Sequence, residues 1–166
     1  MAEIKSIRFD DGRVPYAING DRDRLIYIHP TDTNLPKRYH DACERIRGYA
    51  AELKEKYGIS DLDSIAAEGT GDTEKDIELI YGADAFVKSQ INHIFGYDVC
   101  AVAFGEASCL SVSRDTGLPL YVGFLDALTG IIKEEFGAAA EKFKAAMNSP
   151  RVKGYTDQYQ LSLIHI

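Results

Sequence analysis

An apolar seam between Leu35 and Leu53 constrains this chain more than any other feature of its sequence. Its members lie 4, 3, 4, 3 and 4 residues apart, the spacing that gathers side chains on one face of an α-helix. Residues 31–34 offer helix N-caps before the seam, and Gly58 offers a stop after it. We expect the seam to face the protein's own core, with a second chain as the alternative. The seam consists of Leu35, Tyr39, Ala42, Ile46, Tyr49 and Leu53.

Two further stretches have a helical period. The first is expected to run from about Thr73 to Phe95, where Gly96 ends it. The second begins near Pro119, a residue suited to the first turn of a helix, and carries apolar side chains as far as Met147. Residues 99–104 between them fit either a strand or a helical turn, and residues 105–117 indicate a loop. The apolar face of the first stretch is predicted to contain Ile77, Ile80, Tyr81, Val87, Ile91 and Ile94.

The N-terminal residues 4–28 have the period of β-strands instead. Strands are expected at Ile4–Phe9, around Tyr16 and at Arg24–Ile28, and Asn19-Gly20 is a strong hairpin turn because both residues tolerate positive φ. The predicted fold class is therefore α+β, mostly α. An N-terminal antiparallel two- or three-stranded β-meander is followed by three main amphipathic helices.

The length of 166 residues suits one domain. We assign residues 4–150 to it, with the β-meander at 4–28 and the helical part at 34–148, and residues 151–160 to a tail. Residues 161–166, Leu-Ser-Leu-Ile-His-Ile, resemble a peptide translated from sequencing-adapter DNA. They are interpreted as non-native read-through and are excluded from the functional interpretation.

The overall charge narrows the classes of partner. Lys and Arg number 19 against 26 Asp and Glu, for a net charge of −7, and the basic residues are scattered among acids. Nucleic-acid binding needs clustered basic residues and is not expected. No apolar run approaches the roughly 20 residues that a membrane helix needs, and we expect no secretory signal in the N-terminal residues. The three cysteines form no CxxC pair, so a reducing cytoplasm is the expected location.

Motifs that would carry chemistry are incomplete. His29, His40 and His93 lack the spacing of metal ligands, and no metal or other cofactor is expected. Gly69-Thr70-Gly71 precedes a helix, but acids follow where a phosphate-binding loop requires Lys, which indicates a capped loop. Cys109 lies in a loop that could expose a thiolate, so a small cysteine-dependent enzyme is kept as a minor alternative. The main expectation is a protein without enzymatic activity.

Three groups of segments form a recognisable order: Tyr16–Asp21 with Ile28–Asp32, Gln90–Val99 with Ala103–Gly105, and Gly117–Tyr121 with Phe124–Leu128. Together they resemble small proteins encoded in the tail modules of long-tailed bacteriophages and prophages of Gram-positive bacteria. The resemblance is to tail assembly chaperones, or to the tail-module proteins of unknown function beside them. It extends over roughly residues 4–148, and no catalytic residue belongs to it.

The resemblance implies a function in tail assembly in the bacterial host cytoplasm. Such chaperones coat the tape measure protein, recruit the major tail protein, and are absent from the finished virion. It implies these two proteins as partners, and a homo-oligomer is a further expectation. A structural tail or connector component is the alternative within the phage context. The apolar helix faces supply the candidate partner-binding residues: Leu35, Tyr39, Ile46, Tyr49, Leu53, Tyr121, Phe124, Leu125 and Leu128.

Overall fold

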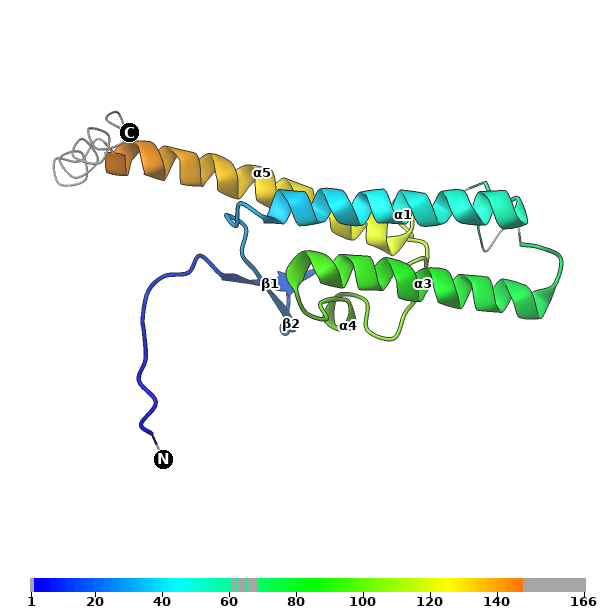
Figure 1. The fold of residues 1–166 in the computed structure, drawn as a ribbon, viewed down its shortest axis with the longest axis horizontal. Coiled ribbons are helices and arrows are strands. Elements are labelled where there is room, and N and C mark those ends of the chain that lie inside the picture. The colour runs from blue at the N-terminus through cyan, green and yellow to red at the C-terminus, as the bar shows by residue number, and fades with distance from the viewer. Residues whose placement is uncertain (1, 61, 63–64, 66–68, 148–166) are drawn as a thin grey trace.

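A computed structural model describes residues 2–60, 62, 65 and 69–147 of the chain (Figure 1). The elements in order are β1 (Val14–Ile18), β2 (Asp21–Ile28), α1 (Leu35–Tyr57), α3 (Thr73–Phe95), α4 (Cys100–Ala103) and α5 (Leu120–Met147). This order confirms the α+β, mostly α class, with the hairpin preceding the helices. The tail at 151–160 and the read-through at 161–166 lie outside the described residues.

The long helices end where the sequence predicts. Gly58 after α1 has φ +70°, and its N–H donates to the Lys54 carbonyl. Gly96 after α3 has φ +82°, and its N–H donates to the Asn92 carbonyl. A residue with a Cβ would be strained at either position, so the two glycines fix the helix ends.

Residues 69–72 form a loop that is capped onto the start of α3, as the acids there predict. The Asp72 side chain accepts from the backbone N–H groups of Glu74 and Lys75 at the start of α3. The Asp76 carboxylate accepts from both the N–H and the hydroxyl of Thr70, at 2.7 and 2.8 Å. These carboxylates occupy the donors that a phosphate would need, so the loop does not form a phosphate cradle.

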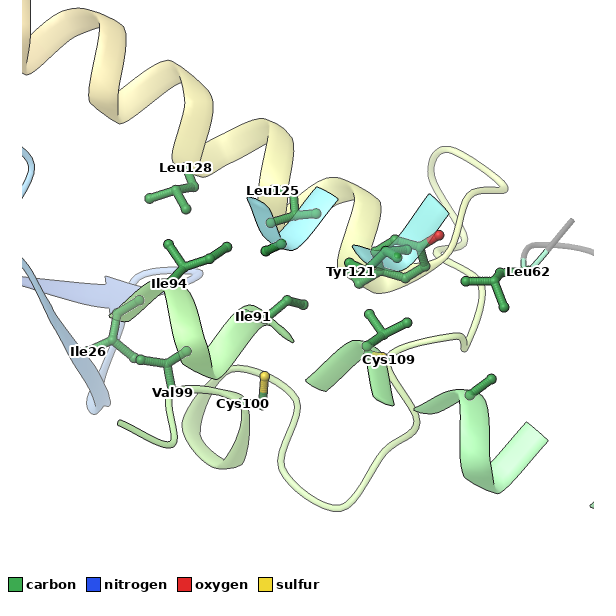
Figure 2. Close-up of a cluster of buried hydrophobic side chains, with 14 of the residues drawn as sticks. Ile26, Leu62, Ile91, Ile94, Val99, Cys100, Cys109, Tyr121, Leu125 and Leu128 are labelled. Atoms are coloured by element: carbon green, nitrogen blue, oxygen red, sulfur yellow. The ribbon is translucent and has the colours of Figure 1, made fainter. Parts of the chain in front are cut away.

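The core is built on one face of α3. Ala83, Val87, Ile91 and Ile94 are each 0% exposed. Figure 2 shows Leu125 and Leu128 of α5 directed toward Ile91 and Ile94, with Val99 and Cys100 closing the core on the other side. The predicted apolar face is wrong at its N-terminal end, because Ile77 is 62% and Tyr81 77% exposed. The buried stripe passes through Ala83 instead.

β1 and β2 form an antiparallel pair with a bulge at Ala17/Ile18. The predicted strand at Ile4–Phe9 is wrong, since residues 2–13 have no regular secondary structure. Tyr27 of β2 donates its N–H away from β1, to the Tyr97 hydroxyl at 2.7 Å. Its partner on β1 is Pro15, so the outer edge of β1 has no N–H at that position for a third strand to accept.

A half-buried ion pair ties the loop before α5 to α3. Lys88 Nζ lies 3.1 Å from Asp84 Oδ2 and donates to the Ala107 carbonyl at 2.9 Å. The other Asp84 oxygen accepts from the Cys109 N–H at 2.8 Å. Burial is the largest single influence on the pKa of Asp84 and acts to raise it. The hydrogen bonds from Cys109, the hydrogen bond from Lys88 and the positive charge of Lys88 together outweigh burial, so the pKa of Asp84 lies below its usual range.

We predict that two Ile→Ala changes on the same helix will differ sharply. Ile91→Ala should lower the free energy of unfolding by about 2–5 kcal/mol, because it opens a cavity in the core. Ile77→Ala should change it by no more than about 0.5 kcal/mol, because that side chain lies in solvent. Urea denaturation followed by circular dichroism measures both. Equal losses would place the buried stripe elsewhere on α3.

Asp84→Asn should cost about 1–3 kcal/mol of stability near neutral pH, because the Lys88 ammonium loses its charged partner. The Asp84 pKa is lowered on folding, so its contribution is present above the unfolded carboxyl pKa of about 4 and is lost as pH falls through the folded value. The stability difference between wild type and variant should therefore shrink from about pH 7 to about pH 3. A difference independent of pH would contradict this account.

Candidate partner-binding groove

An open groove of about 710 Å³ lies between the inner face of the β-hairpin and the first half of α5. β1 supplies the consecutive residues 16–18, β2 supplies alternate residues, and the loop before α5 contributes to the lining. The Phe124 ring packs at 6.0 Å from the Phe95 ring and at 5.7 Å from the Phe104 ring, measured between centroids. The apolar side chains that line the groove include Tyr16, Ile18, Phe104, Phe124, Leu128 and Ile131.

Gly123 leaves the wall of the groove open. It lies on α5 among the lining residues, and a Cβ placed on it would meet no atom within 4 Å. Alanine is favoured over glycine in a helix by about 1 kcal/mol, so helix stability does not explain a glycine here. The absence of a side chain at Gly123 gives a bound segment access to the α5 backbone.

Two acidic residues lie near the end of the groove at Tyr16. Burial is the largest cause that raises the pKa of the Tyr16 hydroxyl, followed by the negative charges of Glu135 and Glu134 and a hydrogen bond with Glu135. Asp115 is the one acid among the lining residues themselves. The one basic lining residue, Arg24, donates to the carbonyls of Val102 and Ala103 at 3.1 and 2.7 Å. The groove is therefore apolar inside and acidic around it.

A second cleft, of about 450 Å³, lies where the hairpin, the start of α1 and the end of α3 meet. His29 and His93 line it together with Arg38. Arg38 is already engaged, because it donates to Asp32 Oδ2 at 2.7 Å and to the Ile94 carbonyl at 2.8 Å. Among the described residues, no three His, Cys, Asp or Glu side chains are grouped so as to hold a metal ion.

The structure places most of the candidate partner-binding residues in the protein's own core. Tyr39 and Tyr49 are half-buried, and both contact other parts of the chain. The Tyr39 hydroxyl accepts from the Thr129 hydroxyl at 3.0 Å, and Tyr49 stacks on Phe86 with centroids 4.3 Å apart. Phe124 and Leu128 line the groove. The buried members are Leu35, Ile46, Leu53, Tyr121, Leu125 and Leu128.

The apolar seam of α1 thus packs against the protein's own core, which was the expectation, and not against a second chain, which was the alternative. The hairpin half of the groove was not predicted as a site. Its signal is the alternation of Tyr16 and Ile18 with residues of the opposite face. That alternation identifies one apolar face of the hairpin, but it does not reveal that α5 lies opposite that face and leaves a gap.

The structure bears on the minor alternative in which Cys109 is an exposed loop thiol. Cys109 is 0% and Cys100 2% exposed. Burial raises the pKa of Cys109 and brings the pKa of Cys100 to about 12, with nearby carboxylates adding to both shifts. A nucleophilic cysteine needs a lowered pKa and access to its substrate. Neither buried thiol has these properties.

We predict that iodoacetamide at neutral pH will modify Cys43 of the folded protein well before the other two cysteines. Cys43 is half-buried. Cys100 and Cys109 are buried and should react at least about a hundredfold more slowly, because the chain must open to expose them. Peptide mass spectrometry measures each site, and all three should react in denaturant. Fast alkylation of Cys109 in the folded protein would revive the cysteine-enzyme alternative.

None of the helices in the part of the chain that the structure describes has the length and apolar character needed to cross a membrane. Comparison with known proteins finds no matching protein-family model and no matching solved structure. A stretch of 71 residues is 31% identical to part of the FMN-dependent NADH:quinone oxidoreductase of Ruminiclostridium cellulolyticum. The match covers 42% of this chain and 33% of that protein, so the chain spans about a third of the relative's length. This likeness establishes no family.

Proposed function

We propose that this protein is a non-enzymatic tail assembly chaperone of a long-tailed bacteriophage or prophage. It acts in the bacterial host cytoplasm, where it binds the tape measure protein and recruits the major tail protein. The observation that carries the proposal is the open apolar groove between the hairpin and α5, next to the segments in which the sequence resembles such chaperones.

The groove suits an amphipathic helix as its ligand. Apolar contacts are not directional, so a groove lined by Tyr16, Phe124 and Ile131 accepts many helices with an apolar stripe. Gly123 lets such a helix approach the α5 backbone closely. Glu134 and Glu135 favour helices with basic residues beside that stripe. A long helical client offers many such segments to successive copies of the chaperone.

The surroundings of the groove also favour binding over catalysis. Its acids lie at the surface among apolar residues, and the buried thiols of Cys100 and Cys109 lie in the core. A structural tail or connector component is the alternative within the phage context. Analysis of purified virions separates the two, because a chaperone is absent from the finished particle and a structural component is present.

The partial likeness to an FMN-dependent NADH:quinone oxidoreductase suggests a second candidate, a flavin-binding protein. Titration of the purified protein with FMN, followed by flavin fluorescence, tests it directly. Saturable binding of FMN would favour the oxidoreductase candidate over the chaperone.

We predict that Gly123→Leu will prevent capture of the tape measure protein. The new side chain projects from α5 into the groove, its Cβ has no atom within 4 Å, and leucine favours the helix more than glycine does. Co-expression with the tape measure protein of the same tail module, followed by affinity purification, should yield a soluble complex with wild type. We expect the variant to bind at least about tenfold more weakly.

Gly130→Leu is the matched control. Gly130 is also an α5 glycine with no atom within 4 Å of the added Cβ, but it does not line the groove. This variant should bind like wild type. If wild type captures no tape measure protein, the proposed function fails. If both leucine variants bind normally, the client occupies another surface.

A further inference from the structure

The N-terminal segment, residues 2–9, exposes three large apolar side chains. Ile4 is 96%, Ile7 89% and Phe9 77% exposed. Figure 1 shows this segment leading away from the helices. Isolated apolar residues are normal on a surface, but three within six positions, all almost fully in water, indicate a segment with a binding partner. We call residues 2–9 the arm.

The arm and the groove are complementary in polarity and charge. The arm offers Ile4, Ile7 and Phe9, and the groove offers an apolar lining with open space at Gly123. The arm carries Lys5 and Arg8 against a single acid, Glu3, so its side chains have a net charge of +1 (2 − 1). Glu134 and Glu135 lie at one end of the groove, and Arg24, its one basic lining residue, is engaged by two backbone carbonyls. A basic segment is therefore favoured in this acidic protein.

The connection between the arm and β1 lies beside His29, which lines the second cleft and not the groove. The N–H groups of Gly12 and Arg13 donate to the Asp10 and Asp11 carboxylates at 2.9 and 3.1 Å. Gly12 has φ +79°, and a Cβ on it would lie 2.8 Å from Nε2 of His29. The chain therefore leaves β1 beside His29, and the outer edge of β1 at Pro15 offers no N–H to draw it back.

We propose that the arm of one copy docks into the groove of a second copy of this chain. The exchange is reciprocal, so two arms and two grooves form a closed two-fold dimer. Ile7 and Phe9 enter the apolar lining, and Lys5 and Arg8 face the acids around the groove. The dimer is a property of the protein without a client and does not depend on what else the groove binds.

The molar mass of the full chain over a range of concentrations tests this proposal. By light scattering after size exclusion, wild type should form a dimer. Phe9→Asp and Gly123→Leu should each raise the dimer dissociation constant at least about tenfold. Neither site lies in the core, so circular dichroism should be unchanged. Tyr81→Asp, at an equally exposed aromatic residue on α3, and Gly130→Leu are the controls and should dimerise like wild type.

Disulfide trapping identifies which chain supplies the arm. One protein carries Phe9→Cys and a second carries Gly123→Cys, and the two are mixed and oxidised. A covalent heterodimer that links these two cysteines supports the exchange. A monomer at every concentration would overturn the proposal, as would a dimer insensitive to Phe9→Asp and Gly123→Leu. A chain that carries both Phe9→Cys and Gly123→Cys provides a further test. If it forms a disulfide within one chain and no covalent dimer, the arm occupies its own groove and the proposed exchange is overturned.

Discussion

Four side chains along one face of α3, from Ala83 to Ile94, are closed to solvent, and the other elements are arranged around them. α1 packs along α3, and its Arg38 donates to the Ile94 carbonyl at 2.8 Å. The loop before α5 is held to α3 through Asp84 and Lys88. A single helix cannot contact every neighbour along its full length. The hairpin lies near the C-terminal end of α3 (Figure 1), and the groove lies between the hairpin and α5.

The helices could be predicted because their signals are local. Gly58 and Gly96 end α1 and α3 by a backbone conformation that favours glycine, and the caps at Asp72 and Asp76 act within a few residues. The hairpin turn at Asn19-Gly20 is local in the same sense, with φ values of 51° and 78°. These interactions do not depend on the rest of the fold, so sequence patterns identify them reliably.

The features that sequence missed depend on contacts between distant segments. The pattern at Ile77 and Tyr81 has the helical period, but none of the described elements covers that face of α3, so both side chains remain in water. The strand predicted at Ile4–Phe9 has suitable residues, but Pro15 offers its edge no donor. The groove needs the hairpin, α4, a loop and α5 together. Of the nine candidate partner-binding residues, Phe124 and Leu128 line the groove. Periodicity identifies the apolar face of a helix, but it does not show which element covers that face.

An apolar groove without a ligand is a hazard for a protein that accumulates in cells, because exposed apolar surface promotes aggregation. A net charge of −7 opposes association at long range but does not cover the lining. If a copy's arm fills the groove until a client arrives, binding becomes an exchange of one apolar segment for another. The affinity for the client is then lowered by the need to displace the arm, and the returning arm assists release. Reversible holding would thus arise from competition within the protein's own dimer, with no energy source and no catalytic residue.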